Sequence, residues 1–214
     1  HHHHHHFHHH HHHQHDLFRE FRADYERLAD MYALLRSAYE GSDFVDRELA
    51  RKTAQLVQAH TKASIIHEAV EVYEITPETL DKIGKSRQSN TVKVFNLIKS
   101  IEHKVQTEAG MAPYLFSIGE RAEAIIEAFK QRQISAQEAL TQLKELIRQI
   151  NEAEKEQAER NIKGEPFAIM WLLKQQGTSS DDAEKIAAEM ATIFQKYPHW
   201  QSSDRQARPV RQKL

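Results

Sequence analysis

The chain has 214 residues, of which 39% are hydrophobic and 28% are charged, with six glycines, five prolines, no cysteine and a net charge of −2. So little glycine and proline is typical of long helices, and the lack of cysteine excludes disulfide scaffolds, thiol nucleophiles and zinc sites built on thiolates. The longest apolar run has seven residues, far short of the ~20 that span a bilayer, so we expect no membrane contact and, by default, a cytoplasmic protein.

Thirteen of the 17 histidines lie in the first 15 residues, and we interpret residues 1–15 as an affinity tag. The folded part is expected over 16–200 and is followed by a polar, basic tail at 201–214. At this length we expect either one helical domain or two packed sub-bundles with a break near 76–90.

Apolar residues spaced three and four apart predict a first helix over 17–39 and a second over 44–73. The first carries a seam of aromatic residues, which has to be covered either by the same chain or by another subunit. Thr76 followed by Pro77 predicts the start of a short helical turn that runs through Ile83.

A polar loop is expected over 85–90, after which Asn90 is predicted to cap a helix that ends near Gly110. Two serines, each followed by a glutamate three residues later, predict capping boxes at the starts of helices over 118–132 and 136–160. The two boxes are Ser117 with Glu120 and Ser135 with Glu138.

Residues 167–175 are apolar nearly all round and predict a buried helix that Pro166 begins. Ser179 with Asp182 predicts the start of a last helix that Pro198 closes. No stretch alternates apolar and polar residues as a strand would. The sequence therefore predicts an all-α, multi-helix bundle of about seven helices with no sheet.

Sequence patterns that carry chemistry are incomplete in this chain. The six glycines are scattered and form no phosphate-binding loop. His67 and Glu68 match the start of a zinc-protease helix, but Glu71 stands where that motif needs its second histidine. Glu102 and Lys104 match half of a nuclease signature, but they fall in a predicted helix, where chance explains them better. We expect no catalytic, cofactor-binding or metal-binding residues.

Positive charge gathers locally between residues 82 and 104, which hold six basic residues and one acidic residue. Such a stretch is usually a solvated helix face, although contact with DNA phosphates is the functional alternative. The candidate DNA-contacting residues are Lys85, Arg87, Lys93 and Lys99.

Several blocks of this sequence together resemble the C-terminal region of type I restriction enzyme R subunits. The blocks are IHEAVEVYEI at 66–75, NTVKVFNLIKS at 90–100, PYLFSIGER at 113–121, RQISAQEA at 132–139, FAIMWLLK at 167–174 and YPHW at 197–200. In that family the R subunit joins a nuclease domain and two ATP-driven motor domains to a helical C-terminal part that binds the methyltransferase core.

The resemblance implies that this chain is a non-catalytic assembly domain of an ATP-dependent endonuclease. The implied partners are the methyltransferase and specificity subunits and the rest of the R subunit. ATP and magnesium would belong to the parent subunit, so no cofactor is expected here. The alternative hypothesis is a DNA-contacting helical domain that uses the basic stretch 82–104 or the C-terminal tail.

Overall fold

The computed structural model describes residues 42–62 and 70–196, together with Glu26 and Asp30. Seven helices and no strand are present in this part of the chain, which confirms the predicted all-α bundle. The helix predicted over 17–39 lies almost wholly outside the described residues, and the tail at 201–214 lies fully outside them. The helices are α2 (Ser42–Lys62), α3 (Thr79–Lys85), α4 (Asn90–Glu108), α5 (Tyr114–Lys130), α6 (Ala136–Arg160), α7 (Gly164–Gln175) and α8 (Ser180–Lys196).

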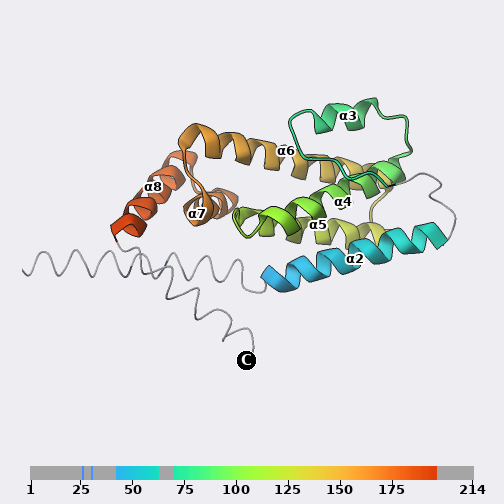
Figure 1. Ribbon diagram of the computed structural model, residues 1–214, viewed down its shortest axis with the longest axis horizontal. Helices are drawn as coiled ribbons and strands as arrows, with labels where there is room; N and C mark the ends of the chain where they lie inside the picture. Colours follow the sequence, from blue (N-terminus) through green and yellow to red (C-terminus); the bar gives the residue numbers. More distant parts are fainter. Residues whose placement is uncertain (1–25, 27–29, 31–41, 63–69, 197–214) are drawn as a thin grey trace, which may run out of the picture.

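Helices α4 and α5 lie side by side in the middle of an elongated bundle, between α6 and α2 (Figure 1). The short helix α3 packs against α6, and α7 and α8 pack together at one end of the bundle. None of these helices is both long enough and apolar enough to cross a membrane.

Helix α4 turns its apolar residues into the core, and seven of them are buried. They are Val92, Val94, Phe95, Leu97, Ile98, Ile101 and Val105. Gly119 of α5 lies where three helices meet. A Cβ atom there would stand 3.3 Å from Val105 of α4 and 3.6 Å from Leu49 of α2. The small glycine therefore allows α5 to approach both neighbours closely.

The start of α4 differs from the prediction by one residue. Ser89, not Asn90, is the cap, and its hydroxyl accepts a hydrogen bond of 3.3 Å from the Val92 N–H. Ser89 has the extended backbone that a capping residue needs, whereas Asn90 is already helical. The short helix α3 likewise begins at Thr79, two residues after Pro77, and runs past Ile83 to Lys85.

The capping box predicted at Ser117 and Glu120 is wrong, because α5 begins at Tyr114 and both residues lie inside the helix. Tyr114 and Leu115 are each only 1% exposed, so the first turn of α5 is held by burial and needs no side-chain cap. Ser117 and Glu120 have the spacing of a capping box, but they lie inside the helix and cap neither of its ends.

The other helix starts follow the sequence signals closely. Ser135 accepts a hydrogen bond of 3.1 Å from the Glu138 N–H, and α6 spans 136–160 as predicted. Ser179 accepts one of 3.2 Å from the Asp182 N–H at the start of α8. Helix α7 begins at Gly164, two residues before Pro166, and five consecutive residues from Phe167 are buried.

The helix predicted over 44–73 is too long, because the backbone is not helical from Val70 to Thr76. The N–H of Glu71 donates to Asn96 Oδ1 and that of Tyr73 donates to Ser100 Oγ, both at 2.8 Å. Buried side chains of α4 thus take the place of helical hydrogen bonds for alternate residues of this segment. Residues 63–69, which include His67, lie outside the described part of the chain.

Replacement of Asn96 by leucine should lower the free energy of unfolding by about 1–3 kcal/mol, since the Glu71 N–H and Gln88 would lose their buried partner. The same replacement of exposed Asn90 on the same helix should change stability by less than about 0.5 kcal/mol. Urea titration measures both values. Equal losses in the two variants would show that these bonds do not hold the extended segment.

Candidate functional site

The four residues predicted to contact DNA do not form one free basic surface. Lys85 pairs with Asp81 at 3.0 Å, and Lys99 pairs with Glu102 at 3.5 Å. Lys93 and Lys99 are six positions apart on α4, which places them about 120° apart around the helix axis. Arg87 is exposed and Lys93 is half-buried, and within the described residues neither forms an ion pair.

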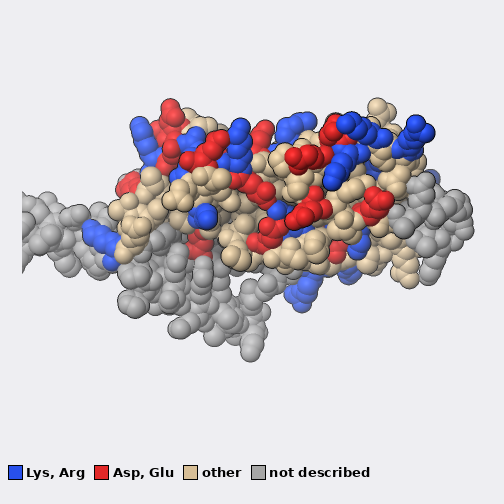
Figure 2. All heavy atoms as spheres, turned by 45° about the horizontal axis from the view of Figure 1, so that its top comes forward, with Lys and Arg blue, Asp and Glu red and all other residues tan. Residues whose placement is uncertain are grey.

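The face of the molecule shown in Figure 2 carries acidic and basic side chains that are interspersed. Many of these charges lie close enough to form ion pairs along or between helices, such as Arg160 with Glu184. Neighbouring charges of opposite sign largely cancel at a distance, so this face has no extended field of one sign.

The sequence candidates for metal or nuclease chemistry are separated in the structure. Glu102 and Lys104 lie on α4, as predicted, and each pairs with a different partner. His103 between them is exposed, whereas the side chains of His60 and His67 lie outside the described residues. In the described part of the chain, no three acidic or histidine side chains are grouped in a way that could hold a metal ion.

An open cleft, called here the α4–α6 cleft, has a volume of about 680 Å³. One wall is the non-helical segment 72–77, and the other includes His103, Lys104 and Glu108 of α4 with Glu154 of α6. Asn151 of α6 donates a hydrogen bond of 3.2 Å to the Thr76 carbonyl and ties the segment to this helix. The cleft thus joins parts of the chain that are far apart in sequence.

Charges inside the α4–α6 cleft are arranged around Lys104. Burial lowers the pKa of this lysine, but hydrogen bonds to Glu108 and Glu154 outweigh that effect and the net shift is upward. Burial also raises the pKa of Tyr73 to about 12, and the nearby Glu71 carboxylate adds to the shift. Because both groups hold their protons tightly, neither is suited to proton transfer at neutral pH. The arrangement is suited to polar and apolar contacts with a bound segment.

The second cleft, called here the α2–α5 cleft, also measures about 680 Å³. It lies between α2 and the turn that joins α5 to α6, and its lining includes Leu56, Phe129, Lys130, Arg132 and Ile134. Sequence analysis did not identify it. Its residues belong to three separate helices and one turn, so no local pattern marks them.

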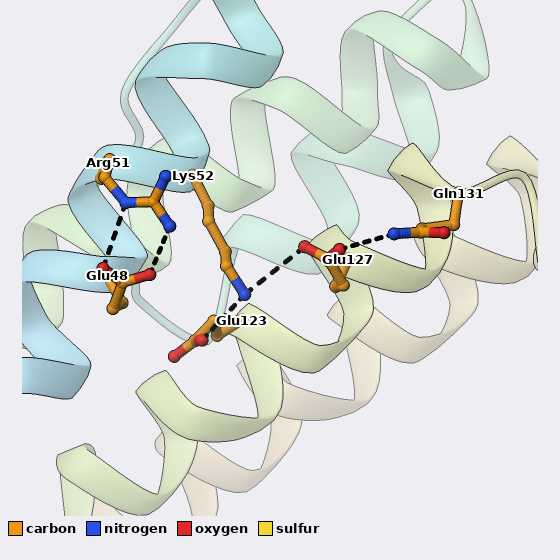
Figure 3. A network of polar contacts seen from close by, with 6 residues as sticks. All are labelled: Glu48, Arg51, Lys52, Glu123, Glu127 and Gln131. Atoms are coloured by element: carbon orange, nitrogen blue, oxygen red, sulfur yellow. Dashed lines mark hydrogen bonds and ion pairs between the residues drawn. The ribbon is translucent and has the colours of Figure 1, made fainter.

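An ion-pair network fixes α2 against α5 beside this second cleft (Figure 3). Lys52 of α2 lies 3.0 Å from Glu123 and 3.4 Å from Glu127, both on α5. Its hydrogen bond with Glu123 raises the pKa of Lys52 despite the opposing effect of burial. Gln131 donates a further hydrogen bond of 2.9 Å to Glu127. The network joins α2 to α5, two of the helices that contribute residues to the α2–α5 cleft.

Stability should depend on the ionisation of Tyr73. Its pKa in the fold, about 12, lies above the ordinary value of 10.0, so its contribution is complete below pH 10 and is lost as the pH rises to about 12. Replacement of Tyr73 by phenylalanine should therefore give a shallower fall in the free energy of unfolding over this interval. Urea titrations across the interval measure the slope. An unchanged slope would mean that Tyr73 titrates as it does in the unfolded chain.

Comparison of this chain with models of known protein families, with curated proteins and with solved structures finds no match.

Proposed function

We propose that this chain is a non-catalytic helical assembly domain that docks a DNA-translocating endonuclease subunit onto its methyltransferase core. The parent would be a type I restriction R subunit, on the basis of the sequence resemblance described above. The structural observation that carries the proposal is the pair of open clefts on a well-packed helical frame, each lined by apolar and charged groups together. Mixed linings of this kind suit protein segments, which bring both apolar anchors and polar flanks.

The proposed mechanism is architectural. A motor that pulls DNA exerts force only when it is held at a fixed point, and a domain bound to the modification enzyme would supply that point. A few anchor side chains at the centre of a contact normally provide most of the affinity. The two clefts offer such anchors places that are shielded from water.

The proposal predicts that the purified chain co-migrates with its cognate methyltransferase complex in size-exclusion chromatography with light scattering. Co-migration should persist from low to moderate salt, because apolar anchors are less sensitive to screening than exposed charges. A folded chain that does not co-migrate at either salt concentration would refute autonomous docking.

Contact with DNA is the second candidate function. It is favoured by Arg87 and Lys93, whose side chains form no ion pair with any residue that the structure describes. If docking is the function, reversing Lys93 and Lys99 to glutamate should leave binding to the methyltransferase complex unchanged. Any affinity for duplex DNA should then be weak in the parent chain, as measured by fluorescence anisotropy. Tight DNA binding that falls steeply with salt and disappears in the variant would favour the DNA-contacting function instead.

A further inference from the structure

The floor of the α2–α5 cleft is apolar and firmly held. Leu56 is only 2% exposed, and Phe129 and Ile134 are partly buried against the core. Phe129 packs edge-on against Phe95 of α4, with ring centroids 6.4 Å apart. An apolar side chain that enters the cleft would therefore meet a preformed hydrophobic surface.

The rim of the same cleft is basic. Lys130 and Arg132 are exposed and line the cleft, and within the described residues neither forms an ion pair. Glu138 is the acidic residue of the lining, and its carboxylate lies 3.2 Å from the Ser135 hydroxyl in the capping box of α6. Arg132 is therefore available to an outside ligand. The charge of Lys130 helps to lower the pKa of Glu127 without pairing with it directly, and the Glu138 carboxylate already has a structural role.

The backbone at Arg132 is unusual. Its φ angle is 58°, in the left-handed region that favours glycine. The turn closes with hydrogen bonds from Gln133 N–H to Ala128 O and from Arg132 N–H to Phe129 O, the pattern that usually places glycine at this position. After α7 the chain makes the same pair of bonds and does use glycine, Gly177 with a φ of 93°.

The turn itself thus gives no reason for an arginine at position 132. Among the described non-glycine residues with positive φ, the other is Asn161, and asparagine tolerates this conformation well. A residue held in an unfavourable conformation is commonly one whose side chain is needed for binding. At position 132 that side chain lines the cleft.

We infer that the α2–α5 cleft binds a segment of a partner protein in which an apolar side chain is flanked by carboxylates. The apolar residue would enter the floor, and the carboxylates would pair with Lys130 and Arg132. The apolar floor favours such a segment over a nucleic acid phosphate, which brings no apolar group to fill it. This inference rests on the proposed docking function and names the surface through which docking occurs.

Variants at position 132 separate a binding role from a structural one. Replacing Arg132 with glycine suits the left-handed backbone, so the melting temperature should stay the same or rise. Combined with Lys130→Ala, it should weaken binding to the methyltransferase complex about tenfold, as measured by calorimetry. Arg132→Lys should retain most of the affinity. The matched control Arg148→Ala removes an exposed cation from α6 and should bind like the parent chain.

A second pair of variants tests the sign of the charge without touching the turn. Ala59 is exposed and lines the cleft, so either a glutamate or a lysine is tolerated there. Ala59→Glu should weaken binding and Ala59→Lys should not. Equal affinities across all of these variants, with the parent chain still binding, would overturn the inference and leave the docking function intact.

A direct probe covers the case in which the methyltransferase complex does not bind at all. A synthetic peptide with one leucine between two pairs of glutamates is titrated into the isotopically labelled chain and followed by NMR. Shifts confined to amides at 55–59 and 129–138 would support the cleft even without docking. No shifts, or shifts there with duplex DNA and none with the peptide, would overturn the inference.

One further variant tests whether the chain fills the cleft itself. If residues 63–69 occupied it, the double change Ile65→Ser and Ile66→Ser would lower the melting temperature as much as Leu56→Ala does. That result would overturn the inference. A melting temperature close to that of the parent chain would support a cleft that is open to a partner.

Discussion

Helix α4 is enclosed by protein along most of its length. The fold depends on the apolar contacts and hydrogen bonds that neighbouring segments make with this helix. Its apolar residues are covered by α2, α5 and α6, which accounts for the order of layers in the bundle. It also buries Asn96 and Ser100, which are 0% and 1% exposed. Buried polar groups without partners are costly, and the oxygens of both side chains accept hydrogen bonds from another segment. The N–H groups of Glu71 and Tyr73 donate these bonds, which hold the segment against α4, where it forms one wall of the α4–α6 cleft.

These hydrogen bonds between distant segments also explain which parts of the fold could be predicted from the sequence. The bounds of α6 follow from the box at Ser135 and from a regular apolar spacing, because both signals act within one helix. The end of α2 could not be predicted in this way. Val70 and Tyr73 continue a helical spacing, yet their backbone is not helical. Acceptors on α4, more than 20 positions later, take the N–H groups of Glu71 and Tyr73. The spacing of apolar residues within one segment does not show that a distant residue will bind its backbone, so it could not predict where α2 ends.

The two clefts could not be predicted either, and the reason is related. Lys104 owes its raised pKa partly to Glu154, and Lys52 owes its position to Glu123, residues that only the folded chain brings together. The basic stretch 82–104 was visible in the sequence because its residues are close in number. Once folded, however, several of those lysines face carboxylates and point in different directions around α4. Density of charge along a sequence is therefore a poor guide to charge on a surface of helices.

The turns after α5 and α7 can be compared residue by residue. The comparison separates a residue that suits the backbone of the turn from one that does not. Both close with the same hydrogen bonds and both need a left-handed residue, so the hydrogen-bond pattern of the backbone is matched between them. Gly177 meets that need without strain, and Arg132 does not. Because the fold would accept glycine at both, the role inferred for the arginine lies in what its side chain reaches. It reaches a preformed apolar cleft whose other exposed cation is also unpaired within the described residues, and there a carboxylate-bearing partner would make use of the strained position.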